Sequence, residues 1–131
     1  MSKVMIIKSI PESLRLVEKF IDEISEELNL SDEVYGNILI ATLEAANNAI
    51  IHGNKEREDL NVEIFMEEED KRITMTIKDF GSGFNPDDIP DPTAPENIEK
   101  TNGRGVFLMS RLSDNIEFHE NGTLVKLSFN I

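Results

Sequence analysis

A carboxylate and a carboxamide, Glu44 and Asn48, stand four residues apart in the first half of the chain. Helical spacing would place both side chains on one face, and the alanines around them would let a ligand or a second layer approach that face closely. Asparagine is a poor helix former, so its position here needs a reason. A binding site supplies one reason, and exposure or a buried structural hydrogen bond supplies another.

A second group of residues, Asp79-Phe80-Gly81-Ser82-Gly83, closely follows a strand expected to end at Ile77. Glycines in such a turn let the backbone pass close to a ligand, and the Asp79 carboxylate could accept a hydrogen bond from an exocyclic amine. An ordinary turn uses the same residue types. The pattern differs from the dinucleotide fingerprint, because no helix follows and the third glycine is absent.

Two glycines, Gly103 and Gly105, open a segment at residues 103–112 that is expected to be helical. Amide groups in the first turn of a helix have no partner within it and lie at the positive end of its dipole, which suits a phosphate. Glycine also marks ordinary helix entries after loops. The order of the three groups is the stronger signal, because a long loop separates the second from the third.

Two helices are expected in the first half of the chain. Apolar residues recur at helical spacing over residues 11–29, which predicts an amphipathic helix. Ser9 and Glu12 fit a capping box at its start. A second helix, which carries the first group of polar residues, is expected from an N-cap at Ser31 to about residue 51 and ends near a glycine.

The period of the apolar residues changes after the second helix. Apolar and polar residues alternate over 62–66 and 73–77, and the charged run 67–72 between them completes a predicted hairpin. Residues 1–8 are expected to form a first strand, and residues 103–112 a short helix. Neither an internal repeat nor a low-complexity tract is visible.

A second predicted hairpin ends the chain. Its strands at 116–120 and 123–129 are joined by Asn121-Gly122, a strong turn signal. Thr123 shares a side of the last strand with the alternating apolar residues and is therefore expected to point toward the helices, where a pocket could lie. The order of elements predicts an α+β fold, a two-layer sandwich in which a mostly antiparallel mixed sheet carries the helices on one face.

Length and composition limit the possible functions. The chain of 131 residues is 39% hydrophobic and fits a single domain over residues 1–131. No apolar run approaches the roughly 20 residues of a membrane span, no signal peptide is visible, and the absence of cysteine favours the cytoplasm. The net charge of −13 argues against direct binding to nucleic acid or an anionic membrane. It is interpreted as a solvated surface or as an acidic face for a basic protein partner.

These motifs together resemble the ATP-binding fold of the GHKL superfamily, which is shared by gyrase, a heat-shock chaperone and the histidine kinases. The resemblance covers nearly the whole chain. Residues 44–53 are similar to the N-box of the bacterial anti-sigma-factor serine kinases, residues 79–84 to the next box, and residues 103–109 to the phosphate-binding box. Gly122-Thr123 matches the late Gly-Thr pair whose hydroxyl supports recognition of adenine.

The resemblance implies ATP and Mg²⁺ as ligands and gives each motif residue a role. Asn48 would hold Mg²⁺ through its side-chain oxygen, with phosphates and waters completing the octahedron. Glu44 would act as general base on the substrate hydroxyl, or orient it. Asp79 would accept a hydrogen bond from the adenine amine. The other implied nucleotide-binding positions are Gly81, Gly83, Asn102, Gly103, Arg104, Gly105, Val106 and Thr123.

The long segment between the second and third motifs, residues 85–102, is interpreted as a lid over the nucleotide, because a loop of this length suggests either disorder or function. It contains four of the five prolines and many acidic residues. This departs from the family pattern, so partner contacts made through the lid do not carry over. His52 is interpreted as a structural histidine at a helix end or as part of the phosphate environment.

By resemblance, the leading hypothesis is a cytoplasmic serine/threonine protein kinase of the anti-sigma-factor type. It would phosphorylate a serine on a small antagonist protein, bind a sigma factor until that antagonist displaces it, and form a homodimer. One alternative is a nucleotide-dependent binding module without phosphoryl transfer. The other is the detached ATP-binding domain of a histidine kinase, whose dimerisation helices with the phosphorylated histidine are not expected within these residues.

Overall fold

The computed structural model of the protein describes residues 1–81 and 101–131, and the side chains of residues 101–104 lie outside the description. Short helical turns at Pro11–Ser13, Ala49–Gly53 and Glu120–Gly122 connect the larger elements. In chain order the strands and long helices are β1 (Ser2–Lys8), α1 (Leu14–Leu28), α2 (Asp32–Asn48), β2 (Asn61–Glu69), β3 (Arg72–Lys78), α4 (Thr101–Leu112), β4 (Asn115–His119) and β5 (Leu124–Asn130).

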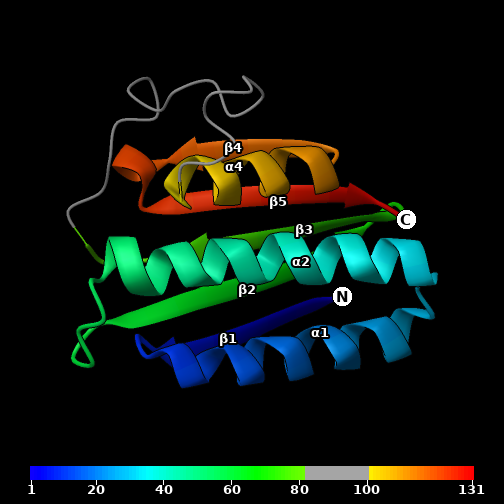
Figure 1. Cartoon of the computed structure of the whole chain (residues 1–131). Coiled ribbons are helices and arrows are strands. Elements are labelled where there is room, and N and C mark those ends of the chain that lie inside the picture. The colour runs from blue at the N-terminus through cyan, green and yellow to red at the C-terminus, as the bar shows by residue number, and fades with distance from the viewer. Residues whose placement is uncertain (82–100) are drawn as a thin grey trace.

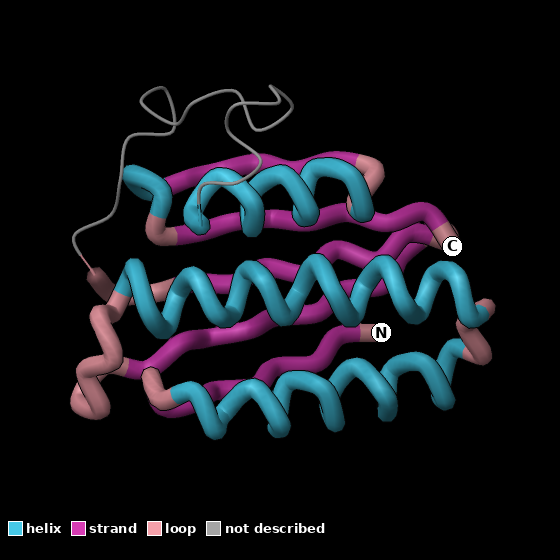
Figure 2. Tube along the Cα trace, viewed as in Figure 1, coloured by secondary structure: helices cyan, strands magenta, loops and turns pink. Residues whose placement is uncertain are grey.

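The strands form one sheet in the order β1-β2-β3-β5-β4. The three long helices lie on one face of this sheet, with α2 between α1 and α4 (Figure 1), and the same view coloured by secondary structure separates the two layers (Figure 2). This confirms the predicted two-layer α+β fold. All four neighbouring pairs of strands in the described residues are antiparallel, so the expectation of a mixed sheet is corrected. The pair of helices between β1 and β2 returns the chain in the opposite direction.

Helix α1 forms where the apolar period predicted a helix, because its buried residues lie on one stripe. The first three residues of the predicted span are a short 3₁₀ turn. The predicted capping box is wrong: the turn is preceded by Ile10, which makes no side-chain cap, and the Ser9 hydroxyl instead donates to the Leu60 carbonyl oxygen at 2.6 Å. A partner distant in sequence therefore outcompetes the local cap. The helix ends at Leu28 and is capped by Asn29, whose φ of 52° is left-handed.

Helix α2 begins as the sequence predicted. The Ser31 hydroxyl oxygen accepts a hydrogen bond from the Val34 amide at 3.2 Å, and two acidic residues in the first turn suit the helix dipole. At its other end α2 continues without a break into a π turn over Ala49–Gly53. A π turn adds a residue to one turn of helix and is frequent at functional sites. Here it sets the exit direction of the chain.

The two hairpins form with tighter or longer turns than predicted. Between β2 and β3 the turn consists of Asp70 and Lys71 alone, both with positive φ. The rest of the predicted charged turn, residues 67–69 and 72, belongs to the strands. Glu67, Glu69 and Arg72 are exposed, whereas Glu68 is half-buried opposite Ile73. Between β4 and β5 the connection is four residues, 120–123, instead of the two predicted, because His119 pairs directly with Leu124.

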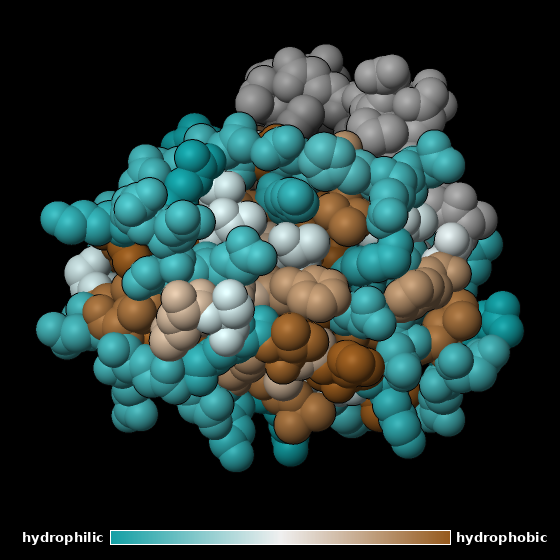
Figure 3. Space-filling view, turned by 180° about the vertical axis from the view of Figure 1, so that it is seen from behind, coloured by the Kyte–Doolittle hydropathy of each residue, from teal (hydrophilic) through white to brown (hydrophobic). Residues whose placement is uncertain are grey.

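The face of the sheet away from the helices is not covered by any other described element. Val4 and Ile6, on the edge strand β1, are 61% and 58% exposed, and Phe65 of β2 pairs with Val4 on the same face. Figure 3 shows apolar side chains gathered together within a mostly hydrophilic surface on this side of the molecule. In the described part of the chain, no helix is long and apolar enough to cross a membrane.

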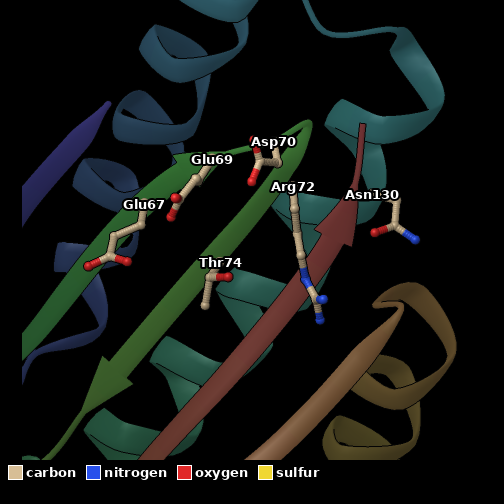
Figure 4. Close-up of a pocket in the computed structure, with 6 residues that line it drawn as sticks. All are labelled: Glu67, Glu69, Asp70, Arg72, Thr74 and Asn130. Carbon is tan, nitrogen blue, oxygen red and sulfur yellow. The ribbon is translucent and has the colours of Figure 1, made fainter.

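A shallow hollow lies near the turn between β2 and β3 (Figure 4). It sits at the end of β3 opposite to Asp79, roughly 20 Å away at the spacing of an extended strand. The hollow therefore takes no part in the predicted site. Its lining is mostly charged or polar and consists of Glu67, Glu69, Asp70, Arg72, Thr74 and Asn130.

Candidate functional site

Glu44 and Asn48 lie on the side of α2 that faces α4, and both side chains are half-buried. A Cβ atom added to Gly105 of α4 would lie 3.1 Å from Asn48 Nδ2, 3.2 Å from Glu44 Oε2 and 3.4 Å from Asn48 Oδ1. The absence of a side chain at Gly105 therefore lets α4 approach these two polar groups closely. The structure thus brings the helical Glu-x-x-x-Asn motif and the Gly-x-Gly motif together.

Helix α4 begins two residues earlier than the sequence predicted, at Thr101. Gly103 therefore lies in the first turn, whose amides have no partner within the helix, and Gly105 lies in the second. This changes the expected role of Gly105. Its amide belongs to the helix interior, and its contribution is the close approach to α2, whereas Gly103 remains placed to offer an amide to a phosphate.

Asp79 directly follows β3 and is 7% exposed. Its amide donates to the Thr123 carbonyl oxygen at 2.8 Å, and its Oδ1 accepts from the Gly81 amide at 2.9 Å. Burial raises the pKa of the Asp79 carboxyl, and this rise is opposed by the Gly81 hydrogen bond and by the positive charge of Lys78. The carboxylate is therefore fixed in orientation and largely shielded from water.

Two glycines allow the π turn to pack directly against Asp79. A Cβ atom on Gly53, the last residue of that turn, would overlap the Asp79 carboxylate, and a Cβ atom on Gly81 would overlap the Gly53 carbonyl oxygen. Neither collision is easily relieved, because the second is with backbone and the Asp79 carboxylate in the first is held by the Gly81 amide. The end of α2 and the turn after β3 are thus one packed unit that only glycine at both positions permits.

Thr123 is next to Asp79 through its backbone rather than through its side chain. It precedes β5 and has a helical backbone, with φ −79° and ψ −12°. The alternation of β5 therefore does not determine where its side chain points, and the prediction that it faces the helices loses its basis in strand alternation. Its hydroxyl donates to the Glu120 carbonyl oxygen at 2.8 Å within the turn.

The remaining predicted positions contribute less to the described geometry. Val106 is buried in the hydrophobic core, and its amide, like that of Gly105, lies in the helix interior, so its described contribution is to packing. His52 is exposed on the π turn. Gly83 and nearly all of the predicted lid at 85–102 lie outside the described residues, and the lid's last two positions belong to α4. The side chains of Asn102 and Arg104 also lie outside the description.

Sequence reasoning did not predict a role for Gly53 or Asn54 in the site. The sequence predicts Gly53 only as the end of a helix, and nothing in the periodicity of the helix indicates the extra residue of a π turn. The available signal was the Gly-Asn pair that directly follows the residues resembling the N-box. Its meaning depends on a contact with residues near 80, which is distant in sequence.

The donor set fits a magnesium ion that is held mainly by its nucleotide. Among the described residues, no cluster of three or more histidine, aspartate or glutamate side chains could hold a metal ion alone. Asn48 offers a hard amide oxygen beside the Glu44 carboxylate, at the contact with α4. Mg²⁺ in nucleotide sites commonly takes one or two protein ligands and completes its octahedron with phosphates and water.

Comparison with known proteins identifies the family. The family described as "Histidine kinase-like ATPase domain" matches residues 7–129, and the chain therefore belongs to it. The chain is 30% identical over 89 residues to Sensor protein kinase GraS of Staphylococcus aureus strain Newman and to Sensor histidine kinase GraS of strain NCTC 8325. Each alignment covers 57% of this chain and 26% of the relative, so the chain spans about a quarter of the curated relatives it matches.

The family match confirms the superfamily that the three motifs predicted, and with it an ATP-binding, kinase-like domain. The resemblance to the anti-sigma-factor subfamily is a finer statement, and the relatives named above are histidine kinases. A serine acceptor is therefore a matter for proposal and experiment.

Proposed function

We propose that this member of the histidine kinase-like ATPase domain family binds Mg-ATP and transfers the γ-phosphoryl group to a serine of a small protein. In the pathway suggested by resemblance, that protein is the antagonist of an anti-sigma factor, and this chain is the anti-sigma factor itself. The observation that carries the proposal is the placement of the Glu44 carboxylate and the Asn48 amide against Gly105 of α4.

The described residues suggest how the nucleotide lies. The buried Asp79 carboxylate would accept from the exocyclic amine of adenine, beside the closely packed backbone of Gly53 and Gly81. The phosphates would then lie toward the first turn of α4, whose free amides and dipole favour negative charge. Asn48 would hold Mg²⁺, which when bound neutralises phosphate charge. ATP as co-substrate also makes the cytoplasm the proposed compartment.

Glu44 is proposed as the general base. The serine hydroxyl oxygen attacks the γ-phosphorus, and its proton passes to the Glu44 carboxylate. The new oxygen–phosphorus bond forms as the bond from the γ-phosphorus to the β,γ-bridging oxygen breaks, and ADP leaves. A positioned base of this kind contributes roughly 10²–10⁴-fold to the rate.

The position of Glu44 supports a hydroxyl acceptor. A serine hydroxyl must lose its proton during attack, whereas a neutral imidazole nitrogen attacks with a lone pair that is already free. A carboxylate beside the phosphate end therefore benefits serine more than histidine. The second candidate, a separate ATP-binding domain that phosphorylates a histidine on another chain, is favoured by the likeness to the GraS sensor kinases. A third candidate is a module that binds a partner without phosphoryl transfer, and no specific contact favours it.

Partners are proposed on the same basis. A sigma factor and the antagonist would compete for the chain, and the net charge of −13 suits basic surfaces on such proteins rather than nucleic acid. A second copy of the chain is the third proposed partner. Its support is the exposed pair Val4 and Ile6 on the edge strand β1, since an uncovered apolar edge commonly marks a contact surface.

The acceptor can be identified by the chemical stability of the product. Purified protein is incubated with Mg-ATP labelled at the γ-phosphate and with the candidate antagonist encoded beside it. Phosphoserine survives acid and is lost in base, whereas phosphohistidine survives base and is lost in acid. An acid-stable label on the antagonist supports the serine kinase. A base-stable label supports the histidine kinase domain, and no label on any acceptor leaves the binding module.

Glu44→Gln tests the proposed base in the same assay. This change keeps the shape of the side chain and removes its charge, so ATP affinity should be retained while transfer falls by roughly 10²–10⁴-fold. Glu33→Gln is the matched control, because Glu33 is exposed in the first turn of the same helix, away from the site. Equal transfer rates in the two variants would remove Glu44 from the mechanism.

A further inference from the structure

Asn54 is a buried side chain that joins three separate segments of the chain beside Asp79. It is 1% exposed and follows the π turn at the end of α2. Its Oδ1 accepts from the Phe80 amide at 2.8 Å. Its Nδ2 donates to the Ser9 hydroxyl oxygen at 2.8 Å and to the Asn61 carbonyl oxygen at 3.0 Å. Both amide protons and the carbonyl oxygen of Asn54 are therefore in use.

The neighbouring groups permit only one orientation of this amide. The Ser9 hydroxyl donates its single proton to the Leu60 carbonyl oxygen at 2.6 Å, so it can only accept from Asn54. The Asn61 carbonyl oxygen likewise can only accept. The nitrogen of Asn54 must therefore face these two groups, and its oxygen must face the Phe80 amide. A flipped amide would leave buried groups unsatisfied at both ends.

The bond to Phe80 reaches the backbone between Asp79 and Gly81. On one side of that amide, Asp79 is tied to Thr123 through its own amide. On the other side, the Gly81 amide donates to the Asp79 carboxylate. Asn54 thus holds the middle of the three successive amides at residues 79–81. Gly53, its neighbour in the chain, packs against the carboxylate itself.

We propose that Asn54 is a positioning residue for base recognition. It holds residues 79–81 on the single backbone path that aims the Asp79 carboxylate at an exocyclic amine, and it thereby selects adenine over purines that lack this amine. The inference rests on the proposed nucleotide placement, in which Asp79 contacts the base. A purely structural role, in which Asn54 only joins the ends of β1 and β2 to the π turn, predicts lower stability with unchanged selectivity.

The test measures a ratio of affinities. Dissociation constants of the full chain are measured for Mg-ATP and for the Mg complex of purine riboside triphosphate, which lacks the exocyclic amine. Dividing one by the other cancels any loss of folded protein, because a reduced folded fraction weakens both apparent affinities equally. Wild type should prefer ATP. Asn54→Ala should reduce this preference on the order of tenfold, mostly through weaker ATP binding.

Two further variants separate positioning from stability. Ser9→Ala removes one anchor of the Asn54 amide but not its bond to Phe80, so it should lower the urea midpoint and keep the preference for ATP. Asn54→Asp keeps an oxygen acceptor for the Phe80 amide and should retain the preference that Asn54→Ala loses, despite lower stability. Should Asn54→Ala fail to fold, Asn54→Leu is the decisive variant, because it keeps a comparable volume but has no acceptor for the Phe80 amide and should lose the preference.

The outcomes distinguish the positioning role of Asn54 from the nucleotide placement on which it rests, in which Asp79 contacts the base. A wild-type ratio near one, or no binding of either nucleotide, overturns both, since Asp79 would then not read the base. A clear wild-type preference that Asn54→Ala retains, or that Asn54→Asp loses, overturns the positioning role alone. Loss in Asn54→Ala together with retention in Ser9→Ala and Asn54→Asp supports it.

Discussion

Asp79 and Glu44 are both carboxylates of the candidate site, yet their surroundings differ. Asp79 is buried, accepts from the Gly81 amide and sits on backbone that is tied to Thr123 and to Asn54. Glu44 is half-buried, and among the described residues its side chain, like that of Asn48, has no hydrogen-bond partner. We call the region around Asp79 the β3 end of the site, and the region around Glu44 and Asn48 the α2 end.

The difference indicates a division of labour. At the β3 end the protein supplies the polar contacts itself, which lowers the cost of ordering the site when a base binds. At the α2 end two polar side chains face α4 with unused hydrogen-bonding groups. The free-energy cost of these unused groups is small, because the side chains are only half-buried and water can still reach them. Recognition of the base would thus depend on side chains and backbone that are already in place. Phosphoryl transfer would depend on groups that gain their hydrogen-bond or metal partners only when the nucleotide binds.

The largest expected effect comes from disturbing the contact that builds the β3 end. Gly81→Ala places a Cβ atom on the Gly53 carbonyl oxygen, and neither backbone can move without breaking the hydrogen bonds around Asp79. The free energy of unfolding should fall by about 3 kcal/mol, at the upper range for overpacking, and ATP binding should be lost. Urea unfolding and ATP titration measure the two effects.

Gly36→Ala is the matched control for that substitution. Gly36 lies within α2, and a Cβ atom there would meet no other atom within 4 Å. The change should stabilise the protein by roughly 0.5–1 kcal/mol, because alanine is the better helix former, and should leave ATP affinity intact. A tolerated Gly81→Ala would mean that the β3 end is looser than its packing indicates.

The second effect concerns the Asp79 carboxylate. Asp79→Asn keeps an oxygen for the Gly81 amide but replaces a charged acceptor at the base, so affinity for ATP and for ADP should fall together. The expected loss is about 1.5–3 kcal/mol, the worth of a hydrogen bond to a charged group. Calorimetric titration with each nucleotide measures it. Unchanged affinity for both would exclude Asp79 from base recognition.

The same variant gives a pH dependence with a defined sign. Burial raises the pKa of Asp79 in the folded state above the value of about 3.9 for a free aspartate. The folded protein therefore holds this proton more tightly than the unfolded chain, and wild type loses stability as pH rises through the window between the two pKa values. Asparagine does not titrate. Urea unfolding across that window should show Asp79→Asn gaining stability relative to wild type as pH rises, and a constant difference would contradict the buried carboxylate.

Sequence reasoning succeeded where the signal was periodic and failed where it depended on distant contacts. The stripe of α1, the cap at Ser31 and the alternation in β2 and β3 each follow from local rules, and together they determine the two layers. Ser9 was misassigned because its hydroxyl bonds to Leu60, a partner that no local pattern reveals. Local rules describe an element well but not what lies against its end.

The site shows the same limit. The spacing of Glu44 and Asn48 predicts a shared helix face, but only the structure shows that Gly105 of α4 meets that face. The π turn is also invisible to a periodicity argument, because one additional residue within a single turn leaves the apolar stripe before it unchanged. The contact between Gly53 and Gly81 follows from that turn and could therefore not be predicted.

The smallest expected effect is at the α2 end. Asn48→Ala should slightly stabilise the helix, because alanine has the higher helix propensity and Asn48 has no hydrogen-bond partner among the described residues. It should weaken Mg-ATP binding on the order of tenfold and no more, since phosphates and waters keep most of the octahedron. Metal-free ATP should bind both proteins equally, because the preformed β3 end is untouched.

Asn47→Ala, a change at the adjacent half-buried asparagine, controls for helix propensity and should leave both affinities as they are. Titrations of ATP with Mg²⁺ and with a chelator give two affinities for each protein. A loss that persists in chelator would mean that Asn48 belongs to the preformed part of the site, and the contrast between the two ends would then disappear.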